Sequence, residues 1–257
     1  MRSVNRTRRA DPSDDPSRRE VWREGLGVAV ATSAYGISFG ALAVASGLDV
    51  WQTCVLSLVM FTGGSQFAFI GVLGAGGMAA LPSAVASAAL LGVRNLAYGM
   101  RMSSIIGTGL WRRAAAAQVT IDESTAVAIS QDSPPLGRLG FWITGLGVFI
   151  GWNLTTLAGA LLGDVLGDPK SWGLDAAAAA AFLALLWPRL KQRQAIAVGV
   201  AAAVVATALT PFLMPGIPVL VAAVVAILVG WFNWAGQDTA LSDRRMPNLA
   251  SDQGESR

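Results

Sequence analysis

The sequence predicts an all-α integral membrane protein, a polytopic bundle of seven or eight membrane helical segments of which at least one is broken or re-entrant. Residues 50–93 and residues 194–237 contain no charged side chain, and each run is long enough for two spans of about 20 residues. Hydrophobic residues make up 53% of the chain and charged residues only 14%, against about 25% in soluble domains. We therefore expect one transmembrane domain over residues 25–236, between disordered cytosolic tails at residues 1–24 and 237–257.

The composition also excludes several classes of function. Histidine is absent and Cys54 is the only cysteine, which excludes an internal disulfide, a Cys/His zinc site and a His-dependent catalytic triad. The charges lie mostly in the tails and in short loops, whereas nucleic-acid binding needs a basic face on a folded surface. No motif of paired carboxylates or of a nucleophile with its base is present. We therefore expect no enzyme activity, no cofactor and no metal site.

The first predicted span covers residues 25–48 and contains the small-residue pair Gly36-x-x-x-Gly40, which is typical of close helix packing. An interfacial turn follows, and a glycine-rich connection at residues 74–82 then leads to an apolar stretch that ends at Arg94. The arginine has two interpretations. It could extend its head group to the membrane surface from a helix end, or it could reach into the bundle, where a buried arginine indicates function.

The most informative stretch is residues 61–67, Phe-Thr-Gly-Gly-Ser-Gln-Phe, in the middle of the first charge-free run. Adjacent glycines each cost a helix roughly 1 kcal/mol relative to alanine, so the helix is expected to open here. Opened backbone at membrane depth must face protein or a water-filled cavity, and transporters build substrate sites in this way. The alternative is that these small residues only let neighbouring helices pack closely.

The second half of the chain contains one clear span and several ambiguous segments. Residues 114–131, with Asp122-Glu123 at their centre, could form a polar transmembrane helix or a helix at the membrane surface. Residues 139–163 form the clear span, with Trp152-Asn153 near its middle and two further G-x-x-x-G faces, at residues 147–151 and 159–163. Residues 171–188 reach the length of a span and include Asp175. Residues 194–237, interrupted by three prolines, predict a hairpin of two spans.

The positive charges restrict the topology, because Lys and Arg accumulate on the cytosolic side. The basic cluster at residues 189–193 and the arginine-rich first tail should both be cytosolic, which places both termini inside. If residues 114–131 span the membrane, the chain crosses eight times and Arg101, Arg112 and Arg113 lie outside. If the segment around Gly63 forms a re-entrant pair of half-helices and residues 114–131 lie at the surface, six full crossings bring all three arginines inside. Both models stay open at this point.

Four segments together resemble the AzlC-type branched-chain amino-acid exporter family. Residues 61–67 are similar to the family signature "aGxSQf", and residues 91–99 to its "NxRHxxYg". Residues 121–126 resemble its "DExfA", and residues 173–176 its "gLDfa". The matches occur in the family's order and cover most of residues 25–236. At three positions the chain departs from the pattern: Gly92 and Asn95 stand where the family has asparagine and histidine, and Ser38 stands where it has proline.

The resemblance implies a secondary transporter in the bacterial cytoplasmic membrane. Such a protein is the large subunit of an exporter of branched-chain and similar apolar amino acids. It works with a small AzlD-type membrane partner, and proton coupling is one way in which its transport could be driven. The G-x-x-x-G faces, which we expect to be exposed, also suggest that the chain works with a second membrane protein. The alternative is a non-transporting structural or assembly subunit of a membrane complex.

A zwitterionic substrate needs donors for its carboxylate and an acceptor for its ammonium. The backbone N–H groups of an opened helix at residues 64–66 could hold the carboxylate. Asp175, or Asp122 with Glu123, could hold the ammonium or carry a coupling proton. Otherwise Asp175 is a helix-capping acid and the other two lie on a solvated helix face. The candidate substrate-binding residues are Gly63, Gly64, Ser65, Gln66, Phe67, Trp152 and Asn153, and the candidates for coupling or charge pairing are Asp175, Asp122, Glu123 and Arg94.

Overall fold

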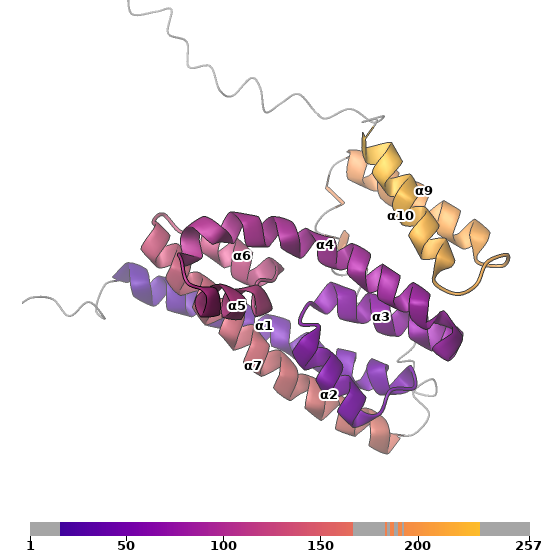
Figure 1. The fold of residues 1–257 in the computed structure, drawn as a ribbon, viewed down its shortest axis with the longest axis horizontal. Coiled ribbons are helices and arrows are strands. Elements are labelled where there is room, and N and C mark those ends of the chain that lie inside the picture. Colours follow the sequence, from indigo (N-terminus) through magenta and orange to yellow (C-terminus); the bar gives the residue numbers. More distant parts are fainter. Residues whose placement is uncertain (1–15, 167–182, 184–185, 188–189, 192, 232–257) are drawn as a thin grey trace, which may run out of the picture. The chain divides into compact units, whose positions relative to one another are not determined.

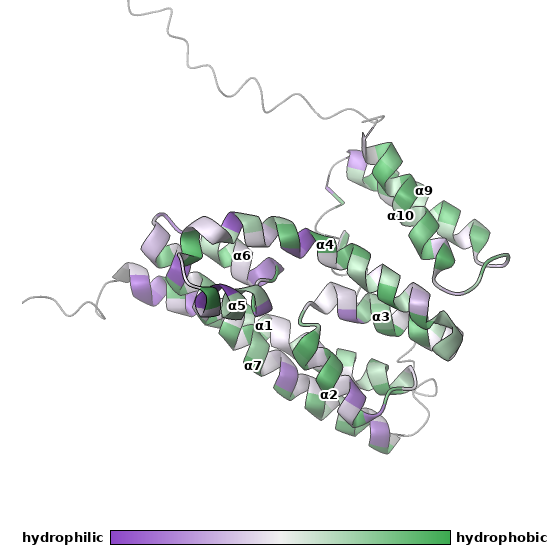
Figure 2. Cartoon of the chain, in the orientation of Figure 1, coloured by the Kyte–Doolittle hydropathy of each residue, from purple (hydrophilic) through white to green (hydrophobic). Residues whose placement is uncertain are grey.

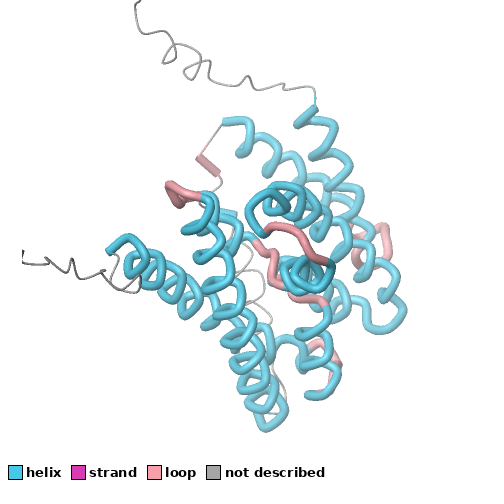
Figure 3. The backbone as a smooth tube through the Cα atoms, turned by 60° about the vertical axis from the view of Figure 1, so that its left-hand side comes forward, coloured by secondary structure: helices cyan, strands magenta, loops and turns pink. Residues whose placement is uncertain are grey.

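The computed structural model describes residues 16–166, 183, 186–187, 190–191 and 193–231. These residues contain helices and short connections and no strand (Figure 3), which confirms the predicted all-α class. The chain divides into two compact units, residues 1–183 with 214–216 and residues 184–213 with 217–257. Each unit is treated by itself below. The predicted segment at residues 171–188, with Asp175, lies almost entirely outside the described residues.

The first unit contains seven α-helices and one short 3-10 turn, η2 (Gly77–Ala80), in its described part (Figure 1). The α-helices are α1 (Pro16–Ala45), α2 (Val50–Val59), α3 (Gly63–Gly76), α4 (Leu81–Ile106), α5 (Leu110–Gln118), α6 (Asp122–Ile129) and α7 (Pro134–Leu166). The second unit contains α9 (Arg193–Leu209) and α10 (Ile217–Trp231), which pack together. This pair confirms the helical hairpin predicted for residues 194–237.

Local chemistry explains several of these boundaries. The Asp49 carboxylate accepts a hydrogen bond from the Gln52 N–H at 2.6 Å, and the Gln52 side chain accepts one from the Asp49 N–H at 3.0 Å, so the pair forms a capping box that begins α2. At the end of α3, Gly77 takes a φ of +58°, a left-handed conformation that favours glycine. Pro82 lies in the first turn of α4, where its missing N–H costs nothing.

The most extensive helix packing joins α1 to α7, and the two helices run in the same direction. Near their starts, a Cβ at Gly25 would lie 2.9 Å from Ile143 Cγ2, and near their ends a Cβ at Gly163 would lie 3.0 Å from Ala41 Cα. Between these points Gly36 and Gly40 lie directly against the backbone and side chains of α7, too close for any Cβ. This confirms the packing role predicted for the G-x-x-x-G faces. Because these faces of α1 and α7 pack against each other, they do not form a docking surface for a second protein.

Helices α2 and α3 form a V whose tip lies at the middle of α7. The open end of the V lies where α1 ends, since a Cβ at Gly74 would be 2.8 Å from Ser46 Oγ. At the tip, the rings of Phe61 and Phe149 meet edge to face with centroids 4.9 Å apart. The chain then turns at η2, and α4 runs antiparallel to α3 toward the start of α7, where Arg138 Nε donates to the Ile105 carbonyl at 2.8 Å.

Helices α5 and α6 form a second V that enters from the other end. Its open end lies beside the start of α1, because Gln131 Nε2 donates to Glu24 Oε2 at 2.9 Å. At its tip a Cβ at Gly145 of α7 would meet Val119 Cβ at 3.0 Å. The two tips touch each other, since Gln118 Nε2 donates to the Leu58 carbonyl at 2.7 Å.

The two Vs give the first unit an inverted internal repeat. Helices α1, α2 and α3 are one long helix followed by a V, and helices α4, α5 and α6 repeat that order in the opposite direction. Each V is interrupted by three residues, 60–62 in the first and 119–121 in the second. Inverted repeats with broken helices that meet at mid-depth are a recurring plan of secondary transporters.

Three sequence expectations need correction. Residues 114–131 form neither a transmembrane helix nor a surface helix, because the chain bends back at residues 119–121 and its tip packs on the middle of α7. Arg94 is not at a helix end, since α4 continues to Ile106. The first tail is not wholly irregular, because α1 begins at Pro16.

Charged side chains are distributed unevenly between the two ends of the α1–α7 assembly. Every described lysine and arginine of these helices except Arg94 lies at the end where α1 and α7 begin, which we call the basic end. The opposite end carries only Asp49 and Asp164 among the described residues of these helices. Figure 2 shows hydrophilic residues on the start of α1 and on α5, whereas hydrophobic residues cover most of the long helices.

Within the described part of the chain, three helical stretches are long and apolar enough to cross a membrane: Ser17–Ala45, Gly63–Ile106 and Pro134–Val165. The middle stretch counts α3, η2 and α4 as one helix, although the chain folds back at η2, so its long part is α4. The three long apolar helices of the first unit are therefore α1, α4 and α7.

Candidate functional site

The break between α2 and α3 lies at the centre of the first unit, and its backbone is held by side chains. Gln66 is fully buried, and its Nε2 donates to the Met60 carbonyl at 2.8 Å and to the Ser57 carbonyl at 3.4 Å. Its Oε1 accepts a hydrogen bond from Trp152 Nε1 at 2.9 Å. These contacts satisfy carbonyls that α2 leaves open at its last turn. The side chain of Gln66 is therefore engaged inside the protein and fixes the open helix to α7.

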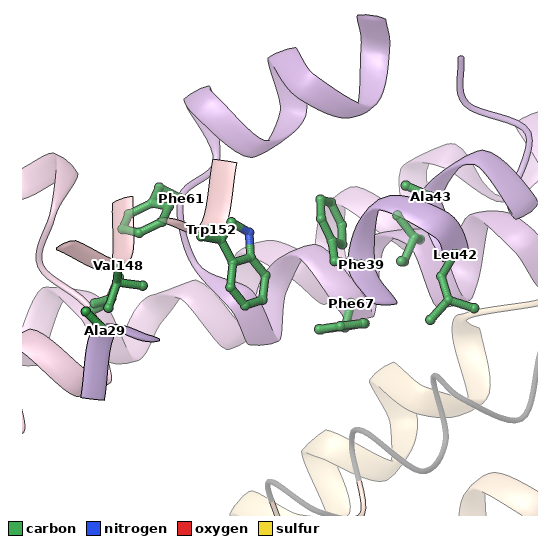
Figure 4. Packing of buried hydrophobic residues seen from close by; sticks show 10 residues of the cluster. Ala29, Phe39, Leu42, Ala43, Phe61, Phe67, Val148 and Trp152 are labelled. Atoms are coloured by element: carbon green, nitrogen blue, oxygen red, sulfur yellow. The ribbon is translucent and has the colours of Figure 1, made fainter. Parts of the chain in front are cut away.

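An aromatic wall lies beside the break. Trp152 stacks on Phe39 with ring centroids 6.1 Å apart, and Phe67 meets both rings edge-on, at 5.8 Å from Phe39 and 6.3 Å from Trp152 (Figure 4). All three side chains are buried. A Cβ at Gly63 would stand 3.3 Å from Trp152 Cη2, so the glycine lets the indole approach the first turn of α3.

Arg94 joins the two Vs. Its Nη1 lies 3.0 Å from Asp122 Oδ2 at the start of α6, and its Nη2 would lie 2.9 Å from a Cβ at Gly64 in the first turn of α3. One guanidinium thus lies against the amino-terminal turn of one broken helix and pairs with the first residue of the other. The side chains of Arg94 and Asp122 are 32% and 27% exposed. The structure therefore selects the second interpretation of Arg94, in which it reaches into the bundle.

The first turn of α3 offers hydrogen-bond donors. The N-cap residue Thr62 makes no side-chain cap, so the N–H groups of Gly63, Gly64 and Ser65 have no intrahelical acceptor. Ser65 Oγ is 1% exposed and has no hydrogen-bond partner among the described residues, and the Nε of Arg94 is likewise buried without one. Buried polar atoms without partners are costly, which marks this turn as a place where a ligand group would be stabilised.

The first turn of α6 differs because it contains its own acids. Asp122 and Glu123 occupy the positions that Gly63 and Gly64 hold in α3, because each pair begins its helix directly after a three-residue interruption. Ser124 closes the turn: its hydroxyl accepts from the Ile121 N–H at 3.1 Å and donates to the Val119 carbonyl at 2.7 Å. Two helix starts, each the positive end of a helix dipole, therefore flank Arg94, but only one of them carries built-in carboxylates.

The structure brings together most of the predicted site residues. Gly63, Gly64, Ser65, Gln66, Phe67 and Trp152 lie at the first break, and Arg94 links them to Asp122, which Glu123 follows in the chain. Asn153 is half-buried, and its Nδ2 donates to the Phe149 carbonyl of its own helix at 2.7 Å. Asp175 lies outside the described residues.

Sequence reasoning missed Gln118 and Phe39, which complete the site. Gln118 connects the tips of the two Vs, and Phe39 supplies the third ring of the aromatic wall. A glutamine at the end of a short alanine-rich helix carries no recognisable signal for that role. For Phe39 the signal was available, because it adjoins Gly40 on the predicted packing face of the first span.

The arrangement contains the groups that binding of a small zwitterion would need. The donors at the start of α3 and the Arg94 guanidinium suit a carboxylate, and Asp122 and Glu123 suit an ammonium group. The Arg94–Asp122 pair has this same charge pattern, so a zwitterion between the two side chains would replace one ion pair with two. A site of this type, built from broken helices inside an apolar helical bundle, defines a multi-pass membrane protein with the plan of a transporter.

Comparison with known proteins assigns the family. The family model described as AzlC protein matches residues 27–166, more than half of the chain, and the chain belongs to the AzlC family. The match begins within α1 and runs to the end of α7, and so includes both Vs and every described site residue. No curated protein and no solved structure matches the chain. Membership confirms the sequence resemblance and places the chain among membrane transport proteins.

The hydrogen bonds of Gln66 lead to a prediction about stability. We expect Gln66→Ala to lower the melting temperature, because it leaves the Trp152 N–H buried without a partner, at about 1–3 kcal/mol, and leaves the Met60 carbonyl with the Thr62 N–H as its one remaining donor. Gln118→Ala removes one bond to an exposed carbonyl, so the melting temperature should fall much less. Thermal unfolding of both variants in detergent tests the difference. Equal melting temperatures for the two variants would show that the Gln66 bonds do not hold the break.

Proposed function

We propose that this chain is the large subunit of a secondary transporter that exports branched-chain and similar apolar amino acids. The observation that carries the proposal is the Arg94–Asp122 ion pair between the starts of α3 and α6. Family membership supports transport as the general function. The further details, namely export, the amino-acid class, a small AzlD-type partner and the bacterial cytoplasmic membrane, are proposals that rest on the sequence resemblance and on the site's chemistry.

In the proposed binding mode, the substrate separates Arg94 from Asp122. The carboxylate accepts hydrogen bonds from Arg94 and from the N–H groups of Gly64 and Ser65. The ammonium donates to Asp122, and Glu123 is the candidate for a coupling proton. The aliphatic side chain packs toward the aromatic wall around Trp152. The substrate carboxylate then replaces Asp122 as the partner of Arg94, and the substrate ammonium replaces Arg94 as the partner of Asp122.

Alternating access would follow from the inverted repeat. The V of α2 and α3 closes the site from one end, and the V of α5 and α6 closes it from the other. The parallel pair α1 and α7 contacts both Vs and would act as the fixed frame. Movement of one V at a time would expose the same site to each side in turn.

Reconstitution into liposomes tests the function. Purified chain, with and without the small partner, is placed in liposomes preloaded with leucine, and efflux is measured. Efflux that needs both proteins supports the two-subunit exporter, and efflux from the chain alone removes the need for a partner. No efflux in either case, with correct folding shown by helical content, would favour the alternative of an assembly subunit. Competition among amino acids in the same assay identifies the substrate class.

The distribution of charge supports a topology with the basic end in the cytosol. In the first unit α1, α4 and α7 then cross fully and both Vs are re-entrant, which favours six crossings for the whole chain over eight. We propose that both termini and the basic cluster at residues 189–193 are also cytosolic.

A matched pair of aspartates at opposite ends tests this orientation. In a Cys54→Ala background, Asp164→Cys should react with an impermeant thiol reagent added to intact cells, whereas Asp132→Cys should not. Both side chains are exposed in the structure, so accessibility differs only by the side of the membrane. Labelling at position 132 without labelling at position 164 would reverse the orientation.

A further inference from the structure

Three arginines converge on one turn at the basic end. Gly107, which ends α4 with a φ of +91°, lies at the centre of the group. A Cβ at this glycine would be 3.8 Å from Arg138 Nη2 and 3.9 Å from Arg112 Nη1. Arg113 Nε donates to the Gly107 carbonyl at 3.2 Å. The guanidinium groups therefore come from two helices, α5 and α7, to the end of a third.

The arginines of this cluster lack an acidic partner in the described part of the chain. The only described ion pair is Arg94–Asp122, at the centre of the unit. Arg113 and Arg138 each donate to a backbone carbonyl near the end of α4, which suits cations at a helix C-terminus. Arg112 makes no hydrogen bond. Sorting of positive charge to the cytosolic side explains why arginines occur at this end, but not why three of them crowd one glycine turn and repel one another.

The surroundings indicate a membrane surface. Leu110 and Trp111 come directly before the two arginines of α5, and their side chains are 79% and 85% exposed. Exposed tryptophan beside arginine is typical of the interface between lipid head groups and acyl chains. All three arginines are also exposed, so a head group can reach them.

We propose that Arg112, Arg113 and Arg138 bind the phosphate of an anionic phospholipid at the turn after α4. Arg112 Nη1 and Arg138 Nη2 both lie within 4 Å of the position that a Cβ at Gly107 would take, and oxygens of one phosphate can accept charge-assisted bonds of about 2.8 Å from two such groups. The acyl chains would lie along Leu110 and Trp111. A lipid bound here would hold α4, α5 and α7 together. It would thereby stabilise the open end of the V whose helix α6 begins with Asp122.

Arg112 provides the sharpest test, because its substitution breaks no hydrogen bond or ion pair among the described residues. The full chain is purified in detergent, and its melting temperature is measured with added phosphatidylglycerol, with phosphatidylcholine or with inorganic phosphate. We expect phosphatidylglycerol alone to stabilise the unmodified protein, and Arg112→Gln to weaken its apparent affinity by about tenfold or more. Arg112→Lys keeps the charge but loses the planar fork, so the affinity should also fall.

Arg101→Gln is the matched control, since this arginine is exposed on α4 near the same end but outside the cluster. It should leave the lipid effect unchanged. Equal phosphatidylglycerol affinities in Arg112→Gln and in the unmodified protein would overturn the proposal. Equal losses in Arg101→Gln and Arg112→Gln would show an effect of overall charge and would overturn it as well. Stabilisation by inorganic phosphate to the same extent would assign the site to a free anion. Lipid binding is measured without transport, so this test and that of the proposed function can fail independently.

Discussion

Gly64→Ala is expected to abolish most transport while the protein still folds. The new Cβ would stand 2.9 Å from Arg94 Nη2 and 3.4 Å from Leu91 Cδ2, so the guanidinium must move away from the first turn of α3. The added methyl would also cover the N–H groups that are proposed to hold the carboxylate. Loss of a charge-assisted hydrogen bond weakens binding by about tenfold to a hundredfold. Leucine affinity and liposome efflux are the measurements.

Gly71→Ala is the control for this substitution. Gly71 lies two turns later in α3, and a Cβ there meets nothing within 4 Å. Alanine at this position should raise helix stability by roughly 0.5–1 kcal/mol and leave transport intact. If Gly64→Ala transports normally, or if it loses activity only through a lower melting temperature, residues 63–66 serve packing alone. The two glycines thus separate the substrate and packing interpretations of the stretch at residues 61–67.

Much of this site was predictable because its small and polar residues are unusual within a long apolar run. Paired glycines, a serine and a glutamine in a charge-free run indicated an opened helix, and one of the two interpretations of the arginine after the same run placed it inside the bundle. The G-x-x-x-G faces predicted close packing, which α1 and α7 provide. What the patterns did not specify was the partner of each group. Gln66 was expected to face substrate, but it holds the end of α2 and the Trp152 ring instead.

The inverted repeat was not visible in the sequence, and the structure shows the physical reason. The first break reads Thr62-Gly-Gly-Ser65 and the second reads Ile121-Asp-Glu-Ser124, so only the serine is shared. In the proposed binding mode the two starts have different roles, because one offers N–H donors to a ligand group and the other carries carboxylates. Residues 114–131 were also misinterpreted, since a short helix that stops at mid-depth has neither the length of a span nor the polarity of a surface helix. Contacts with α7 determine its position, and they are not encoded locally.

Two of the positions at which the chain departs from the family pattern, Gly92 and Asn95, lie close to the candidate site. Gly92 faces Ser65, whose Oγ would lie 3.6 Å from a Cβ at this position and has no hydrogen-bond partner. Asn95 stands where the family has histidine, and its Oδ1 is also buried without a partner. Both positions follow Leu91 on α4, on either side of Arg94. Two of the three positions at which the chain departs from the family signature therefore lie beside Arg94, whereas Ser38 lies on α1.

The ion pair itself can be tested by removing charges from the protein and from the substrate in parallel. Asp122→Asn should weaken leucine binding by about tenfold or more, because the ammonium loses a charged acceptor. The same variant should bind 4-methylpentanoate, which has the carboxylate but no ammonium, at least as well as the unmodified protein does. Arg94→Gln should show the reverse pattern, with weakened leucine binding and unimpaired binding of 3-methylbutylamine, which lacks the carboxylate. Such paired changes isolate each contact as a double-mutant cycle does.

A purely structural ion pair gives a different result, because both variants would then lose all ligands equally, in proportion to their lost stability. The loss of folding stability should be small in both variants. Both side chains are about a third exposed, and ion pairs screened to this extent contribute about 1 kcal/mol or less to folding. Asp132→Asn, at an exposed aspartate of the basic end, controls for the change in net charge. A selective loss of leucine with retention of the singly charged analogues would establish that Arg94 and Asp122 each bind one end of the zwitterion, and that their mutual pairing is the state of the empty site.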